Sequence, residues 1–178
     1  MGRITPREGN VSLRGRRSAP KPFKGEFKPH AFPDGFVLII DTREQDLLFD
    51  KMPKGLTVKR DKLDDGDYSI VGFEGTFAIE RKKISDFLGY ITHEREKTIT
   101  KMKRLAKMDF AALVIEVDED ELYFGSSYSQ VGAEVIRAAL VSFQVRYGVH
   151  IYMSNDRGKI ERWILDWAIK YHNVKKEA

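Results

Sequence analysis

The chain has 178 residues, 42% of them hydrophobic, which is enough for one domain with a sizeable core. It contains no cysteine, which excludes disulfides, thiolate metal sites and a cysteine nucleophile. No apolar run approaches the ~18 residues of a membrane span, and the N-terminus lacks the apolar stretch of a signal peptide. We therefore expect a soluble, intracellular protein that does not contact a membrane.

The formal net charge of +4 is unevenly distributed along the chain. Residues 1–32 carry eight Lys or Arg and two Glu, are rich in Pro and Gly, and show no hydrophobic period. This composition predicts a disordered basic arm over residues 1–33 and one folded domain over residues 34–178. Such an arm either contacts nucleic-acid phosphates or serves as a solubilising tail, and the sequence leaves both interpretations open.

The folded part begins with a continuous apolar run at residues 36–41. This run predicts a buried strand with Asp41 at its end, where a sheet presents side chains to solvent or ligand. Residues 45–55, which include Pro53 and Gly55, predict a loop or a short helix. Residues 57–63 alternate well enough to predict a second strand.

Residues 66–82 contain two short runs rich in β-branched and aromatic residues around a turn at residues 72–75, which predicts a β-hairpin. If the turn is centred on residues 73 and 74, Asp67 faces Glu80 across the hairpin. Lys82 lies two residues beyond Glu80 and projects from the same side of the sheet. The opposite side collects the apolar residues Tyr68, Ile70, Phe77 and Ile79.

Two facing carboxylates repel each other unless a cation neutralises them. Oxygen ligands without a nearby thiolate or imidazole suit a hard divalent ion such as Mg²⁺ or Mn²⁺. A lysine beside that ion orients an attacking water or stabilises the negative charge that develops on a phosphate. The residues alone also permit a simpler interpretation, a surface hairpin whose charges are solvated.

The remainder of the chain alternates helical and strand patterns. A helical period over residues 83–108 weakens near residues 90–95, which predicts two helices with a break between them. Beyond them the pattern predicts a strand, a helix, a strand and a last helix, at residues 110–117, 129–147, 149–153 and from Asp156. This order predicts an α/β fold with a mixed central sheet and helices on both faces.

Gly66-Asp67, followed by Glu80-Arg81-Lys82 and, three residues later, Asp86, resembles the GD…ERKxxxD signature of the XPF family of structure-specific nucleases. That family is a branch of the PD-(D/E)xK, or restriction-endonuclease-like, superfamily. Three further matches fall in chain order: the D-x-R-E string at residues 41–44, the arginine at position 95, and the apolar strand ending in Glu at residues 113–116.

The resemblance implies a restriction-endonuclease-like fold and a metal-dependent endonuclease that cuts flaps, forks or junctions in DNA, as repair and recombination require. It implies that Asp67, Glu80 and the backbone carbonyl of Arg81 hold Mg²⁺ or Mn²⁺, while Lys82 positions the attacking water. The other implied site residues are Asp41 and Asp86 in supporting roles, and Arg43, Arg81 and Arg95 in phosphate contacts or site-organising pairs.

The second helix of the 83–108 pair carries Lys97, Lys101 and Arg104 on its polar side. These cations either line a DNA path or form an ordinary solvated face.

The chain departs from the family after the last strand. Many members continue with a tandem helix-hairpin-helix module that binds DNA and mediates dimerisation, whereas here a single amphipathic helix follows. We therefore expect a stand-alone nuclease of phage or prokaryotic type, cytoplasmic and nucleoid-associated, with a homodimer or a partner subunit left open. Two alternatives remain: a catalytically silent DNA-binding scaffold, and a Holliday-junction resolvase or restriction-like nuclease of the same superfamily. The intact Asp67, Glu80 and Lys82 set disfavours the scaffold.

Overall fold

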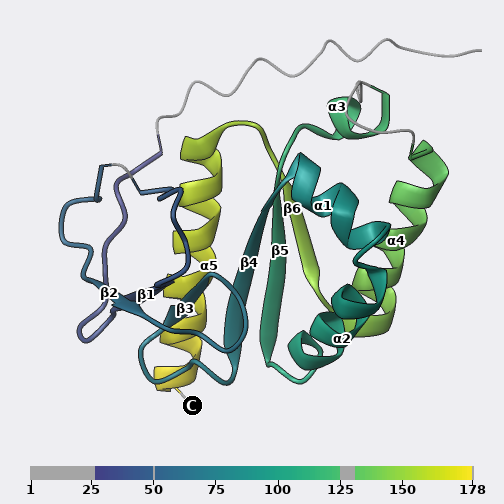
Figure 1. Cartoon of the computed structure of the whole chain (residues 1–178). Helices are drawn as coiled ribbons and strands as arrows, with labels where there is room; N and C mark the ends of the chain where they lie inside the picture. The colour runs from purple at the N-terminus through teal and green to yellow at the C-terminus, as the bar shows by residue number, and fades with distance from the viewer. Residues whose placement is uncertain (1–26, 50, 125–130, 178) are drawn as a thin grey trace, which may run out of the picture.

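The computed structural model describes residues 27–49, 51–124 and 131–177. Within these ranges a six-stranded sheet is surrounded by five helices (Figure 1). The strands are β1 (Leu38–Asp41), β2 (Val58–Asp61), β3 (Tyr68–Ile70), β4 (Phe77–Lys83), β5 (Phe110–Glu116) and β6 (His150–Met153). The helices are α1 (Ile84–Ile91), α2 (Arg95–Leu105), α3 (Glu119–Phe124), α4 (Ala133–Tyr147) and α5 (Arg157–Glu177).

The strand order in the sheet is β2-β1-β3-β4-β5-β6. The pairs β1–β2, β4–β5 and β5–β6 are parallel, whereas β1–β3 and β3–β4 are antiparallel. The sheet is therefore mixed, as predicted. Strand β4 lies inside the sheet and runs directly into α1, so residues near its end lie beside the first turn of that helix.

Alternating side chains of β4 serve the two faces of the sheet. Phe77 and Ile79 pack into a cluster with α5, whose residues Ile160 and Ile164 are fully buried there. Ala78 faces the other way, into a cluster formed with α1, α2, α3 and α4. The predicted α/β architecture with helices on both faces is confirmed, and Figure 1 shows α5 separated from α1, α2 and α4 by the sheet.

The central hairpin has the predicted register, because Tyr68 pairs with Ile79. Its connection is wider than a two-residue turn. The N–H of Phe73 donates to the carbonyl of Ile70 at 2.9 Å, and the N–H of Phe77 donates back to the carbonyl of Phe73 at 2.9 Å. The register survives a different turn because the apolar residues at positions 68, 70, 77 and 79 must all enter the same core.

The predicted break between two helices is confirmed, since α1 ends at Ile91 and α2 begins at Arg95. The acidic segment after β5 forms the short helix α3. Glu119 and Asp120 lie in its first turn, where the helix dipole favours negative charge. The expected helix over residues 129–147 is described from residue 131, and α4 begins at Ala133.

Most of the predicted basic arm, residues 1–26, lies outside the described residues. Residues 27–33 form no helix or strand, but they lie against α5. The carbonyl of Lys28 accepts a hydrogen bond from Arg162 at 2.6 Å, and His30 contacts Asp166 at 2.8 Å. These contacts join Lys28 and His30 to α5. Among the helices of the described residues, none is long and apolar enough to cross a membrane.

Candidate active site

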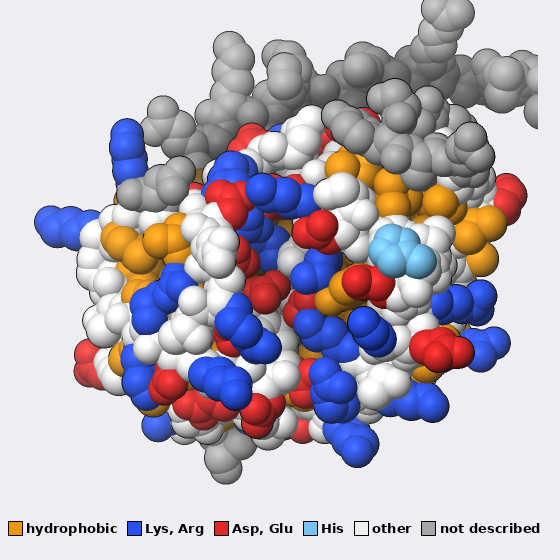
Figure 2. Space-filling model, viewed as in Figure 1, with side chains coloured by type: hydrophobic (Ala, Val, Ile, Leu, Met, Phe, Trp, Pro, Cys, Tyr) orange, Lys and Arg blue, Asp and Glu red, His pale blue; other side chains and the backbone are white. Residues whose placement is uncertain are grey.

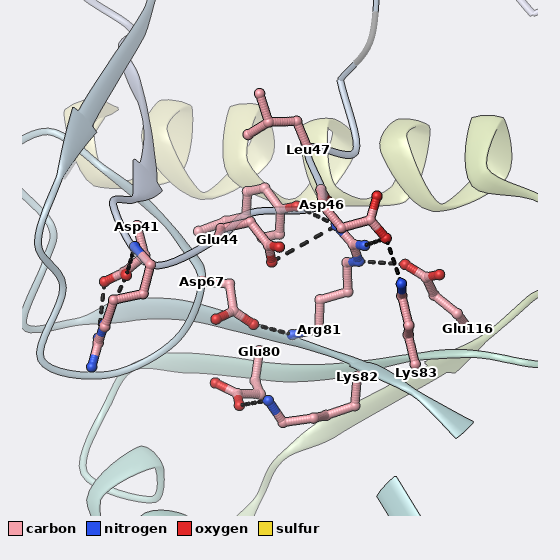
Figure 3. Close-up of polar contacts among 12 residues, drawn as sticks. Asp41, Glu44, Asp46, Leu47, Asp67, Glu80, Arg81, Lys82, Lys83 and Glu116 are labelled. Atoms are coloured by element: carbon pink, nitrogen blue, oxygen red, sulfur yellow. Dashed lines mark hydrogen bonds and ion pairs between the residues drawn. The ribbon is translucent and has the colours of Figure 1, made fainter. Parts of the chain in front are cut away.

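Asp67 and Glu80 face each other across neighbouring strands. Asp67 immediately precedes β3, and its N–H donates to the carbonyl of Ile79 at 2.8 Å, which continues the antiparallel pairing. Its carboxylate accepts a hydrogen bond from the backbone N–H of Arg81 at 2.7 Å (Figure 3). Glu80 lies on β4 and is fully buried. The predicted juxtaposition of the two carboxylates is therefore present in the structure.

Gly66 allows Asp67 to come this close to β4. Its φ of +81° lies in the left-handed region that favours glycine. A β-carbon at this position would also lie 3.0 Å from the carbonyl oxygen of Ile79 and 3.1 Å from the Cβ of Ala78. Both constraints require glycine, which gives the Gly66-Asp67 string a structural reason.

Three donors engage the Glu80 carboxylate. The ammonium group of Lys82 lies 2.9 Å from Oε1, as expected for two residues on the same side of β4. Tyr90 of α1 donates its hydroxyl to the same oxygen at 2.7 Å, and Lys101 of α2 donates to Oε2 at 2.5 Å. Burial alone would raise the pKa of Glu80, but the charges of Lys101 and Lys82 outweigh it and lower the pKa.

Asp67 is less well compensated. Within the described ranges, the N–H of Arg81 is the donor that reaches its carboxylate. Burial and, after it, the charge of Glu80 raise the pKa of Asp67 to about 7. The metal-free site thus holds one carboxylate that is ionised by its lysine neighbours and a second that lacks a sufficient cation.

This difference predicts an unusual pH dependence of the metal-free protein. Because Asp67 binds its proton more tightly when folded, its contribution to stability is full below the unfolded pKa of ~3.9 and is lost as the pH rises through about 7. In EDTA, we expect urea unfolding between pH 5 and pH 8 to show wild-type stability falling relative to Asp67→Asn, by at most about 1.4 kcal/mol per pH unit. Titrations of groups that do not interact with Asp67 are common to the two proteins and cancel. Parallel pH profiles would contradict the assignment.

Arg81 points away from this pair, toward the α5 face of the sheet (Figure 3). Its buried guanidinium lies 3.0 Å from Asp46 and 3.7 Å from Glu44, and its Nε contacts Glu116 at the end of β5. Arg157, at the start of α5, joins the same group through Asp46 at 3.3 Å. Of the two roles expected for Arg81, the geometry favours a site-organising pair, because its side chain does not project to the same side as Lys82.

The carboxylate of Asp41 is also engaged in hydrogen bonds within the protein. Its two oxygens accept hydrogen bonds from the N–H and Nε of Arg43 at 2.7 and 2.8 Å, from Nη2 of Arg43 at 2.9 Å, and from the N–H of Leu63 at 2.7 Å. The hydrogen bonds from the Arg43 side chain hold the pKa of Asp41 well below its usual range. The carboxylate of Asp41 is therefore ionised, and hydrogen bonds use all four of its acceptor positions. Through the bond to Leu63 it links the end of β1 to the 62–66 loop, while the Arg43 side chain remains exposed.

The remaining predicted site residues divide into two groups. Asp86 is exposed in the first turn of α1 and lines the same cleft as Asp67 and Glu80. Also lining this cleft are Lys97, Lys101 and Arg104, although Arg104 pairs with Asp65 at 2.8 Å. Arg95 instead borders a separate cavity of about 500 Å³ between α2 and α4. The structure thus does not bring Arg95 to the cleft of Asp67 and Glu80, and its expected phosphate contact or site-organising pair stays a prediction.

The cleft has a volume of about 990 Å³ and is lined by seven basic and eight acidic side chains. Basic and acidic groups are intermingled on the face shown in Figure 2. In the described residues no third His, Cys, Asp or Glu joins Asp67 and Glu80 in a metal-binding group. The donor set still fits a hard divalent ion, because it offers buried carboxylate oxygens and one of the two carboxyl groups lacks a compensating charge.

Several residues of the site were not predicted from the sequence. Tyr90 lies four residues after Asp86 on α1, so its position on the same helical face was the available signal. Burial and, after it, Glu80 raise the pKa of Tyr90 well above its usual value, which keeps its hydroxyl a donor. Two acidic partners of Arg81, Glu44 and Glu116, end strings that the sequence analysis singled out, but their pairing with Arg81 carried no local signal. The pairing of Lys101 with Glu80 carried none either.

Comparisons with known proteins identify the family and agree with the fold. A family model described as the ERCC4 domain matches residues 40–166. The solved structure of XPF from Aeropyrum pernix is 21% identical, with a TM-score of 0.53, and the match covers 68% of this chain and 54% of that one. The structure of the same protein in complex with DNA is 20% identical, with a TM-score of 0.57 and coverages of 79% and 66%. The chain thus spans less than two thirds of either solved chain. No curated protein sequence matches it significantly.

Proposed function

Because the chain belongs to the ERCC4 domain family, we propose that it is a metal-dependent endonuclease that hydrolyses phosphodiester bonds in flaps, forks or junctions of DNA. The observation that carries the proposal is the placement of Asp67 and Glu80 face to face on neighbouring strands, with Lys82 on the same side and an open cleft before them. The fold shared with XPF from Aeropyrum pernix supports it, since that protein has been solved in complex with DNA.

In this proposal Asp67, Glu80 and the backbone carbonyl of Arg81 hold Mg²⁺ or Mn²⁺. A divalent ion held by these groups would supply Lewis-acid activation of water and would neutralise charge that develops on the phosphate. Lys82 acts as a donor that orients the attacking water and stabilises the phosphate oxygens. The water oxygen forms a bond to phosphorus while the bond to the 3′-oxygen breaks, and the products are a 5′-phosphate and a 3′-hydroxyl.

The other residues act through these groups. Asp41, held by Arg43, binds the backbone of Leu63 and so fixes the 62–66 loop that leads to Asp67. The Arg43 side chain stays exposed and can contact a phosphate. Lys97 offers a second exposed cation in the same cleft. Asp86 stands at the cleft edge in a supporting role. The basic segment at residues 1–33 adds phosphate contacts that are independent of DNA sequence and weaken with salt.

One observation favours a second candidate function, a catalytically silent DNA-binding scaffold. Glu80 already accepts hydrogen bonds from Tyr90 and Lys101 and pairs with Lys82, so its charge is neutralised without a metal. A protein that never binds a metal would be stable in this arrangement.

A cleavage panel separates the two functions. Labelled duplex, flap, fork and four-way junction are incubated with wild type or Asp67→Asn in Mg²⁺, Mn²⁺ or EDTA. We expect the wild type to cut branched substrates with either metal, and neither EDTA nor Asp67→Asn to permit cleavage. Wild type that cuts nothing with either metal establishes the scaffold. Cleavage confined to the four-way junction indicates a resolvase-type nuclease instead.

A further inference from the structure

We propose that the ammonium group of Lys101 neutralises Glu80 in place of the metal ion. It holds Glu80 in the metal-free protein, leaves that carboxylate when a divalent ion binds, and then contacts a DNA phosphate. Metal and DNA would therefore bind cooperatively through one lysine side chain. The inference rests on the proposed function.

The hydrogen bonds of Glu80 identify the lysine that must move. A carboxylate has about four acceptor positions, two on each oxygen. Oε1 is occupied by Lys82 at 2.9 Å and the Tyr90 hydroxyl at 2.7 Å. In the described residues Oε2 has one donor, Lys101 at 2.5 Å. Oε2 is thus the oxygen open to a cation, and Lys101 is the cation already on it.

A divalent ion and an ammonium group repel each other strongly when they share one carboxylate oxygen. Lys82 is held near its position by the Tyr90 ring, whose centroid lies 4.9 Å from its ammonium nitrogen. Lys101 comes from a different element, α2, and its ammonium nitrogen lies farther from the same ring centroid, at 6.0 Å, and 3.4 Å from the Tyr90 hydroxyl. Its side chain is 22% exposed at the cleft wall, against 19% for Lys82. When a divalent ion binds, the Lys101 side chain can therefore swing into the cleft, while Lys82 remains beside Glu80.

The released ammonium group enters a cleft that suits phosphate. Lys97 and Arg104 lie one helical turn before and after Lys101 on α2, and both line the same cleft. Without a metal the acidic side chains of the cleft slightly outnumber the basic ones, which disfavours binding of the DNA phosphates. The charge of the bound ion and the released lysine both strengthen DNA binding. Thermodynamic linkage requires DNA to strengthen metal binding by the same factor.

The first test measures Mn²⁺ binding to the DNA-free protein by titration calorimetry. Lys101→Met removes the competing charge but keeps the length of the side chain, and we expect it to bind Mn²⁺ about tenfold more tightly than wild type. Lys103→Met, at an exposed position of the same helix, should bind as wild type does. Lys101→Gln, which can still donate to Glu80, guards against a folding defect and should also bind more tightly. Equal or weaker binding by both Lys101 variants overturns the inference.

The second test measures DNA binding over a salt titration, with EDTA or with Ca²⁺, on DNA confirmed intact afterwards. In EDTA, Lys101 is tied to Glu80, so wild type and Lys101→Met should share one slope of log K against log salt. In Ca²⁺, the wild-type slope should be steeper than that of Lys101→Met by about 0.7–0.9, the value of one phosphate contact. Lys97→Met, which removes an exposed cleft lysine, should reduce the slope in both conditions. A slope difference between wild type and Lys101→Met that is the same in EDTA and Ca²⁺ overturns the inference.

Asp67→Asn separates this inference from the proposed function. If wild type binds metal and cuts DNA in an Asp67-dependent way while the Lys101 variants behave as wild type, the coupling fails and the nuclease assignment survives. If neither wild type nor the Lys101 variants show Asp67-dependent metal binding, both fail.

Discussion

Glu80→Gln is expected to reduce the cleavage rate by about 10²–10³-fold or more at saturating DNA, with the fold intact. The substitution removes one of the two carboxylate charges proposed to hold the divalent ion, so Mn²⁺ affinity should fall together with the rate. Glutamine retains an acceptor for the Tyr90 hydroxyl, which limits the structural disturbance. Single-turnover kinetics over a range of metal concentrations measure both effects.

Lys82→Met is the matched comparison, since it alters a group that touches Glu80 without removing a metal ligand. Its rate should fall by a similar factor, but its Mn²⁺ affinity should be retained or increased, because a transition-state contact and a positive charge are lost. DNA binding in EDTA should persist in both variants. If Glu80→Gln lost activity and kept wild-type metal affinity, Glu80 would not be a ligand.

Arg81→Met is expected to lower the free energy of unfolding by about 3–5 kcal/mol, the cost of removing one member of a buried ion group. Its guanidinium side chain is 3% exposed and lies between Asp46 and Glu116. Without it, Asp46 keeps Lys83 at 2.8 Å and Arg157 at 3.3 Å, whereas the 14% exposed Glu116 keeps the longer contact to Arg157 at 3.9 Å. Urea unfolding measures the change directly. Methionine fills the space of the aliphatic part of the arginine side chain, so the loss reports mainly on the removed guanidinium group.

Arg157→Met is its control, because Arg157 contacts the same Asp46 from a side chain that is 36% exposed. Solvent screens this pair, and we expect a loss of about 1 kcal/mol or less. Comparable losses in the two variants would show that the network is not organised around Arg81. Arg81→Met should also reduce activity, since the N–H of residue 81 positions Asp67 and depends on the local path of β4.

The sequence by itself determined the central hairpin and the pairing of its two carboxylates. Side chains alternate with period two along a strand, and Tyr68, Ile70, Phe77 and Ile79 all had to enter one core. Those two constraints allow one register, which places Asp67 opposite Glu80 and Lys82 beside Glu80. The same local rules predicted the break between α1 and α2 and the two-sided α/β fold.

The tertiary structure alone decided what surrounds those carboxylates. Asp46 reaches Arg81 across 35 residues of sequence and Arg157 across 111, separations at which no periodicity carries information. Helical spacing placed Lys101 on a polar face of α2, but only the packing of α2 against α1 and the sheet brought its ammonium group to Glu80 and turned Arg95 toward α4. The hairpin face that carries Asp67 and Glu80, which the residues alone also permitted to be solvated, is therefore covered by helices. This burial leaves Glu80 fully buried and raises the pKa of Asp67 to about 7. Burial depends on all elements packed around a residue, and for that reason local pattern specified the positions of the two carboxylates but not their electrostatic state.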